Sequence, residues 1–308
     1  MYHFIVNPAS RSGKGQKLWD KTIEPALKKR GIKYKVHFSK KPGDLTRLAK
    51  ELTSDSTAKE PAHIVVVGGD GTVNETLQGM GANTGTTISY IPTGSSNDLA
   101  RDLGFSKNPE EILDHLLDHA KYQYMDAGML SSSNGNHLFA VSCGIGFDAA
   151  VCQEANLSKV KKVFNKIGLG KLTYLGIAIK QLFAAKAISC DLYLDDKEPI
   201  HLKKFLFIAM MNHRYEGGGF QFCPAAKSDD GILDICVVGS LPKLLILLAL
   251  PTAFFGKHYM FPRIDGYQAK KVHIVTSDPL WIHTDGEVIE KNSEITVSCI
   301  PDKIILRY

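Results

Sequence analysis

The chain has 308 residues, a net charge of +5 at pH 7 and a composition of 44% hydrophobic and 22% charged residues. These proportions are those of a globular protein and exclude a disordered or fibrous one, and the length predicts about two domains. The small positive charge suits an anionic ligand or a membrane surface, but it is too small to indicate a nucleic-acid partner.

The first 126 residues alternate between short apolar runs and helical patterns. The expected strands are 2–6, 34–38, 63–67 and 88–91, and the expected helices are 18–27, 44–52, 73–80 and 110–119. Pro25 predicts a kink or a break in the first helix, and Gly31 is positioned to end it. Such alternation is typical of a parallel sheet with helices on both faces. We therefore expect an α/β domain over 1–126, with a Rossmann-like three-layer arrangement.

After Asp126 the pattern changes to short apolar runs separated by Gly, Asp, Asn and Pro. The expected strands are 137–144, 190–196, 203–212, 231–239, 270–277, 279–287, 294–301 and 303–308, with a long helical insertion at 157–186. Strands at this turn-rich spacing favour a sandwich or a barrel, and we expect a β-sandwich-like domain over 127–308. We expect a cleft between the two domains, and the last strand could return to the first domain.

Several sequence features indicate where in the cell the protein acts and whether it enters a membrane. The six cysteines include no CxxC pair, which disfavours zinc and thioredoxin-type sites and suits free thiols in a reducing cytoplasm. The first residues resemble a strand more than a signal peptide. The longest apolar run, 241–258, contains Pro251 and is short for a membrane span. A buried helix is the favoured interpretation of this run, and a membrane-touching element is the alternative.

The stretch HIVVVGGDGTVNET (63–76) runs a buried strand directly into a glycine turn. Glycines let the backbone approach a phosphate, and N–H groups at the start of a helix point at the anion. The carboxylate of Asp70 would repel that phosphate unless a divalent cation lay between them. The stretch therefore indicates a magnesium–nucleotide site, with a ligand-free structural turn as the alternative.

Two other nucleotide-binding motifs, the P-loop and the dinucleotide-binding GxGxxG/A pattern, are absent or weak in this sequence. No GxxxxGK[ST] sequence occurs, so the chain is not a P-loop protein. A GxGxxA pattern stands at Gly144, Gly146 and Ala149, but the acid expected after a following strand gives way to the lysine-rich 157–186 segment. A dinucleotide site there is a weak hypothesis.

Two further polar loops follow expected strands. NPASRSGKG (7–15) offers Asn7, Ser10, Arg11, Ser12 and Lys14, and PTGSSNDLAR (92–101) offers Ser95, Ser96 and Asp98. Either loop alone is explained by ordinary helix capping. Because the carboxyl ends of parallel strands meet at one sheet edge, we expect both loops to gather beside GGDGT.

These motifs, with HTDGE at 283–287, resemble the bacterial diacylglycerol kinase-type lipid kinase family, which is related to sphingosine kinases and more distantly to NAD kinases and phosphofructokinases. The resemblance implies that the α/β domain binds ATP and that a lipid enters between the domains. The residues it implies for ATP are Asn7, Pro8, Ala9, Ser10, Arg11, Ser39, Gly68, Gly69, Asp70, Gly71, Thr72, Val73, Asn74, Glu75 and Ser95. It also implies an acidic set that supports Mg²⁺, formed by Asp70, Asp98 and Asp126. The insertion-like Arg11-Ser12 departs from the shorter family loop.

The second half holds two acidic clusters. Asp285 and Glu287 flank a glycine, and such carboxylates can take the proton of a lipid hydroxyl; an Asp-Gly hairpin turn is the alternative. The resemblance implies Glu287 as the catalytic base with Asp285 beside it. In AAKSDDGILDI (225–235) it implies a structural magnesium loop, with Lys227 and Ile232 binding through carbonyls and Asp230 through its carboxylate.

The 157–186 segment interleaves lysines with apolar residues, which is typical of either a helix on an anionic membrane or a solvated helix packed on its own domain. We expect a cytoplasmic protein with a lipid substrate, at most peripheral membrane contact and no nucleic acid. An exposed sheet edge could pair two subunits.

The function expected from these features is ATP-dependent phosphorylation of the hydroxyl of diacylglycerol or a related lipid, giving a phospholipid such as phosphatidate. An NAD kinase is the nearest alternative, but it should carry a separate Asn-Glu motif well downstream of GGDGT. A nucleotide- or lipid-binding regulator without catalysis is the other alternative, and it would normally show eroded GGDGT or DGE segments.

Overall fold

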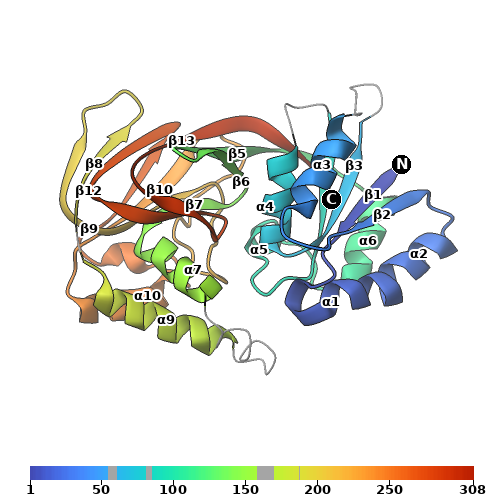
Figure 1. Ribbon diagram of the computed structural model, residues 1–308, viewed down its shortest axis with the longest axis horizontal. Helices are drawn as coiled ribbons and strands as arrows, with labels where there is room; N and C mark the ends of the chain where they lie inside the picture. The colour runs from blue at the N-terminus through green and yellow to red at the C-terminus, as the bar shows by residue number, and fades with distance from the viewer. Residues whose placement is uncertain (55–60, 81–84, 158–169, 187) are drawn as a thin grey trace. The chain divides into compact units, whose positions relative to one another are not determined.

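The computed structural model describes residues 1–54, 61–80, 85–157, 170–186 and 188–308, with residues 170–175 described by their backbone alone (Figure 1). The chain divides into two compact units. The first unit is Met1–Ala127 with Pro301–Tyr308, and the second is Gly128–Ile300. The first unit thus ends one residue after the expected boundary at Asp126, and it also contains the C-terminal residues.

The first unit is built on parallel strands. β2 (Tyr34–Phe38), β1 (Tyr2–Val6), β3 (His63–Gly68) and β4 (Thr87–Pro92) lie in that order, and the end of β13 (Glu287–Arg307) pairs in parallel with β4. The register places Val6 beside Phe38 and Val67, and Gly68 beside Pro92. All four strands therefore end at the same edge, so the loops that follow them start close together.

Helices cover both faces of these strands (Figure 1). α1 (Ser10–Leu18), the π-helical segment Trp19–Ile23, α2 (Glu24–Lys29) and α6 (Pro109–Asp118) cover one face, and α3 (Asp44–Ser54) and α4 (Asp70–Gly79) cover the other. Phe4 and Val6 of β1 pack with Trp19 on the first face, while the intervening Ile5 is equally buried. Burial of consecutive residues explains why these strands are apolar throughout.

The kink or break predicted at Pro25 appears as a change of helix type, with helical backbone angles kept at Leu18, Ile23 and Glu24. A π-helical segment, Trp19–Ile23, separates α1 from α2, and Pro25 lies in the first turn of α2. Proline has no N–H to donate to the preceding turn, which accounts for an irregular helix at this point. Gly31 follows the helix with φ of 65°, as expected of a glycine that ends a helix.

The second unit is built on antiparallel strands. β11 (Ile264–Ala269), β10 (Leu233–Gly239), β9 (Ile200–Met211), β7 (Ser142–Gly146), β12 (Lys271–Thr284) and β13 lie in that order. β8 (Ile188–Leu194) pairs with both β9 and β12, and β5 (Tyr122–Ser132) pairs with β6 (Gly135–Phe139). The second half is therefore rich in strands, as the sequence predicts.

Some expected boundaries in this half are wrong. The runs at 270–277 and 279–287 belong to one strand, β12, and those at 294–301 and 303–308 belong to β13. A shift in the β12–β13 register between Val275 and Leu280 absorbs the irregular residues within β12. β5 and β11 were not expected as strands, because each contains an Asp or Gly that resembles a turn signal.

Alternate residues of β9 face two apolar clusters. Ile208 and Met210 belong to a core enclosed by strands, while Phe207 and Ala209 face a second cluster with α9 (Gly170–Ala184) and α10 (Lys243–Ala253). α7 (Phe147–Leu157) precedes α9, and residues 158–169 of the expected 157–186 helix lie outside the described residues.

The interpretation of 241–258 as a buried helix is half right. α10 buries Ile246, Ala249 and Ala253, but Leu244 is 70% exposed and Leu248 56% exposed. The run is apolar on both sides of the helix, so its composition did not distinguish a fully buried helix from one with an exposed apolar face. In the part of the chain that the structure describes, no helix is long and apolar enough to cross a membrane.

Candidate active site

The three glycine-containing loops of the first unit come together at the end of its strands. Asn7 donates from Nδ2 to Thr72 Oγ1 at 3.2 Å, which joins the first loop to GGDGT. Ser10 Oγ lies 2.7 Å from Thr93 Oγ1, which joins the first loop to the third. These contacts confirm the expectation that NPASRSGKG and PTGSSNDLAR gather beside GGDGT.

Two glycines allow the second and third loops to touch. A Cβ placed on Gly94 would lie 2.6 Å from the Cα of Gly69 and 2.7 Å from Asn97 Oδ1. A Cβ on Gly68 would meet the side chain of Thr72 at 2.3 Å. These positions therefore need glycine because backbone and side-chain atoms approach them closely.

The helix after GGDGT begins earlier than predicted. α4 starts at Asp70 instead of Val73, with Gly69 in an extended conformation before it. Gly69 donates its N–H to Thr72 Oγ1 at 3.2 Å, and Thr72 and Val73 return their N–H groups to the Gly69 carbonyl. The first N–H groups of α4 thus lie within the glycine sequence itself, which suits an anion at this position.

The first residues of α1, which belong to the NPASRSGKG segment, have non-helical backbone angles. Arg11 and Ser12 have φ of 43° and 59°, followed by Gly13 at 92°. Two consecutive non-glycine residues in the left-handed region are costly, and such strain is often found at ligand-binding loops. The insertion-like Arg11-Ser12 of the sequence is therefore the part of this loop with the least regular geometry.

Asp70 has a structural contact as well as its place in the glycine turn. Its carboxylate accepts the N–H groups of Asp98 at 3.0 Å and Leu99 at 3.3 Å, at the start of α5 (Asp98–Asp102). Asp98 in turn pairs with Arg101. Burial, with Asp70 and Asp98 nearby, holds the pKa of Tyr90 well above its ordinary value. Asp70 and Asp98 therefore lie close together around buried polar groups.

The carboxylates of Asp126 and Glu75, and the backbone of Ser39, make hydrogen bonds to other segments of this unit. Asp126 is buried on β5 and accepts the N–H of Asp302 at 3.0 Å. Glu75 accepts N–H groups from Gly43 and Leu45, the latter at 3.3 Å, so its carboxylate caps α3. Ser39 donates its N–H to the Val6 carbonyl directly after β2, at the same sheet edge as the loops.

In the second unit, Asp285 and Glu287 have different surroundings. The Asp285 carboxylate accepts three backbone N–H groups, from Ala140 at 2.9 Å, Val141 at 2.8 Å and Ser142 at 2.9 Å. Glu287 is the first residue of β13, and its side chain is exposed. Asp285 therefore anchors the turn, while the Glu287 side chain is exposed to solvent.

The expected magnesium loop forms a turn before β10. Asp230 Oδ1 accepts the N–H of Ile232 at 3.2 Å, Gly231 has φ of 72°, and the Lys227 and Asp230 side chains are exposed. Oxygen atoms of a short exposed turn are the type of ligand that Mg²⁺ accepts, with water completing its shell.

Two family models match the chain. The diacylglycerol kinase catalytic domain matches residues 1–129, and the YegS C-terminal NAD kinase beta sandwich-like domain matches residues 141–307. A diacylglycerol kinase of Mycobacterium tuberculosis is 30% identical over 285 residues, which cover 92% of this chain and 87% of that protein. The chain belongs to the diacylglycerol kinase-type lipid kinase family.

Other relatives agree with this membership. A protein of Pseudomonas fluorescens named as a YegS-like lipid kinase is 30% identical over 270 residues, covering 86% of this chain and 81% of the relative. A crystal structure of a diacylglycerol kinase from Bacillus anthracis matches with a TM-score of 0.72 at 21% identity, covering 99% of this chain and 95% of that one. This structural likeness concerns the fold: mixed α/β, with a β-sandwich-like C-terminal domain.

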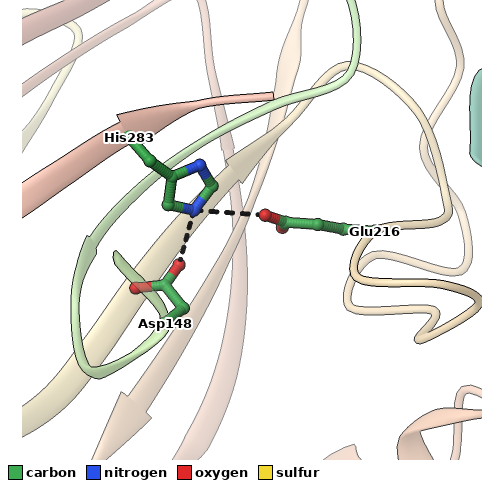
Figure 2. A group of neighbouring side chains, drawn as sticks. All are labelled: Asp148, Glu216 and His283. Carbon is green, nitrogen blue, oxygen red and sulfur yellow. Dashed lines mark hydrogen bonds and ion pairs between the residues drawn. The ribbon is translucent and has the colours of Figure 1, made fainter. Parts of the chain in front are cut away.

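For this lipid kinase family member, the sequence analysis missed one cluster in the second unit. His283 of β12 is fully buried, and its Nε2 lies 3.2 Å from Asp148 Oδ2 and 3.1 Å from Glu216 Oε1 (Figure 2). Among the described residues, this is the group whose possible metal-ligand atoms all lie within 4.8 Å of one another; Asp70, Asp98 and Asp126 form no such group. His283 is the first residue of HTDGE, a motif singled out for its acids, and no motif pointed to Asp148 or Glu216 as its partners.

The weak GxGxxA pattern has a structural explanation in the same cluster. β7, which contains Gly144 and Gly146, pairs antiparallel with β9 and β12, so it does not belong to the parallel unit that binds dinucleotides. A Cβ on Gly144 would lie 1.9 Å from Asp148 Oδ2 and 2.4 Å from His283 Nε2. Gly144 therefore leaves the space in which this acid and histidine meet.

Proposed function

We propose that the protein transfers the γ-phosphoryl group of ATP to the hydroxyl of diacylglycerol or a related membrane lipid. The observation that carries this proposal is the meeting of three glycine-containing loops at one sheet edge, through Asn7–Thr72, Ser10–Thr93 and Gly69–Gly94. Backbone N–H groups at the start of a helix, here at the start of α4, are what a bound triphosphate requires. Membership of the lipid kinase family supports a lipid acceptor.

The residues of the first unit would bind and orient the nucleotide. The N–H groups at the start of α4 would face the phosphates, and the exposed Arg11 and Lys14 of the first loop would balance their charge. Positioning and electrostatics account for most of the catalysis in phosphoryl transfer. These residue types therefore match the chemistry that the reaction needs.

Magnesium bound with ATP would neutralise the charge on the β- and γ-phosphates. Both oxygens of Asp70 already accept N–H groups, and Asp126 is engaged by Asp302. Mg²⁺ usually keeps several water ligands, so support through water fits these carboxylates better than a direct cage of three acids. We assign this supporting role to Asp70, Asp98 and Asp126.

Glu287 is the residue we assign as the general base for the lipid hydroxyl. General-base catalysis contributes about 10²–10⁴-fold, so Glu287→Gln should lower turnover by at least about 100-fold and leave ATP binding intact. Glu294→Gln, an exposed change on the same strand, is the matched control. Turnover of Glu287→Gln within a few-fold of the parent enzyme would contradict the assignment.

The acceptor is tested first. Purified protein is given ATP and magnesium with diacylglycerol in mixed micelles, or with NAD, and the phosphorylated product is measured. Phosphatidate is the expected product. Activity on NAD alone would overturn the lipid acceptor and leave the nucleotide site in place.

Peripheral membrane contact is part of the proposal, on the cytoplasmic face of the membrane. Leu244 and Leu248 lie one turn apart on α10, and Phe255 and Met260 beyond it are each 74% exposed. Lys243 of α10 lies 5.4 Å over the ring of Phe183, an exposed residue of α9, so the two helices present neighbouring apolar and basic groups. An exposed apolar face bordered by lysines suits an anionic lipid surface.

A further inference from the structure

The Asp285–Glu287 turn is held from two sides. Asp285 has φ of 49° and Gly286 has φ of 82°, so the chain reverses tightly before β13 begins at Glu287. Asp285 donates its N–H to the Ser142 carbonyl at 2.8 Å, and its carboxylate accepts the three N–H groups described above. Gly286 donates its N–H to His283 Nδ1 at 3.1 Å. The residue directly before Glu287 is therefore hydrogen-bonded to a buried histidine.

We propose that His283 is a positioning residue for proton transfer, which clamps the turn carrying Glu287 to Asp148 and Glu216. One ring nitrogen accepts from Gly286 and the other faces the two carboxylates (Figure 2). Because the imidazole is rigid, contacts at both nitrogens fix the turn relative to α7 and to the loop of Glu216. The inference rests on the proposed function in that Glu287 is the group being positioned.

The hydrogen-bond directions favour a proton over a metal ion in this cluster. The Gly286 N–H points at the lone pair of Nδ1, so the ring proton belongs on Nε2, where Asp148 and Glu216 can both accept it. Burial lowers the pKa of His283, but the charges of Cys152 and Glu216 and the hydrogen bonds to Asp148 and Glu216 raise it well above its ordinary value. The geometry opposes a second proton on the ring, because a proton on Nδ1 would point at the Gly286 N–H. A metal ion on Nε2 would require the proton on Nδ1, directly against the Gly286 N–H. The cluster is thus a hydrogen-bonded clamp.

The clamp also reaches a glycine loop. Glu216 directly precedes Gly217, Gly218 and Gly219, whose φ angles are 63°, 89° and 122°. Glu216 and Phe220 exchange backbone hydrogen bonds across this loop, at 2.9 and 3.0 Å. His283 therefore connects two segments that are far apart in the sequence, the glycine loop and the turn that carries Glu287.

Two substitutions of His283 distinguish the role of Nδ1 from the role of Nε2. In His283→Gln the amide can still donate to Asp148 and Glu216, but the acceptor for Gly286 is lost. In His283→Asn the amide oxygen can still accept from Gly286, but the two buried carboxylates lose their donor. His273, on the same strand and paired with Glu294 at the surface, provides the controls His273→Gln and His273→Asn.

We expect the two variants to rank in opposite order in two measurements. His283→Gln should lower kcat for the lipid about 10- to 100-fold, with the KM for ATP within two-fold, since small misplacement of a reacting group costs up to about 10²-fold. His283→Asn should lower the midpoint of thermal unfolding more and kcat less. The His273 variants should match the parent enzyme in both measurements. If the loss of kcat in His283→Gln equals the fraction of this variant that is unfolded, the proposal is overturned.

Hydrogen exchange tests the clamp independently of activity. The amides of residues 284–288 should exchange faster in His283→Gln than in the parent protein or in His283→Asn. If the parent protein phosphorylates no lipid, the proposed function fails, and exchange alone decides on the clamp. Unchanged exchange in His283→Gln would overturn the proposal, as would stoichiometric zinc in the purified parent protein that is lost in His283→Gln.

Discussion

At the scale of single residues, the two acids of HTDGE differ in what their carboxylates touch. Asp285 accepts three backbone N–H groups, whereas Glu287 is exposed. Hydrogen bonds to a charged group contribute about 1.5–3 kcal/mol each. Asp285→Asn should therefore lower the free energy of unfolding by about 2 kcal/mol or more, measured by denaturant titration, while Glu287→Gln should leave it unchanged. An Asp285→Asn protein as stable as the parent but inactive would instead assign Asp285 to the chemistry.

Gly94 carries a second prediction at this scale. A Cβ at this position would meet Gly69 at 2.6 Å, so Gly94→Ala should push the second and third loops apart. We expect the KM for ATP to rise at least about ten-fold, since misplacement of a binding group costs up to about 10²-fold. Gly176→Ala on α9, where a Cβ would meet nothing within 4 Å, is the control. Equal KM values for the two variants would show that this glycine contact is not part of the nucleotide site.

At the scale of elements, the magnesium site expected in the turn before β10 stays a prediction, and the turn itself is closed by the Ile232 N–H donating to Asp230 Oδ1. If Mg²⁺ binds the carbonyls of Lys227 and Ile232 with the Asp230 carboxylate, removing it with a chelator should lower the midpoint of thermal unfolding. Asp230→Asn should abolish most of that response. Asp229→Asn, an exposed neighbouring change, should retain it. If the parent protein unfolds at the same temperature with and without the chelator, the prediction of a magnesium site in this turn is wrong.

At the scale of the whole molecule, a lipid kinase must meet an acceptor that resides in a membrane. The exposed apolar face of α10 and α9 predicts that the double variant Leu248→Ser with Phe255→Ser sediments less with vesicles containing anionic lipid. ATP binding should be unchanged. Tyr124→Ser removes an aromatic side chain that is 55% exposed in the first unit, and it serves as the control. Vesicle binding unaffected by the double variant, or a change from dimer to monomer instead, would show that another partner covers this face.

Much of the fold was predictable because its signals are local. The apolar run of β3, the helix irregularity at Pro25 and the end of the helix at Gly31 follow from neighbouring residues, and all appear where expected. The merging of strand runs into β12 and β13 was not predictable, because pairing with other strands carries the chain through residues that resemble turns. The start of α4 at Asp70 was missed for a related reason, since glycines obscured a helix that Thr72 and Gly69 stabilise.

The sequence by itself determined the family, the order of the three nucleotide loops and the presence of acids in HTDGE, because these depend on residue type and on spacing along the chain. Only the tertiary structure decided what each acid does. Asp70 caps α5, Glu75 caps α3 and Asp285 anchors a turn, each by accepting N–H groups from a distant segment. His283, Asp148 and Glu216 lie far apart in the chain and meet only in the folded second unit. A carboxylate has the same chemistry wherever it stands in a sequence, and its partners, supplied by the fold, determine whether it is free to react.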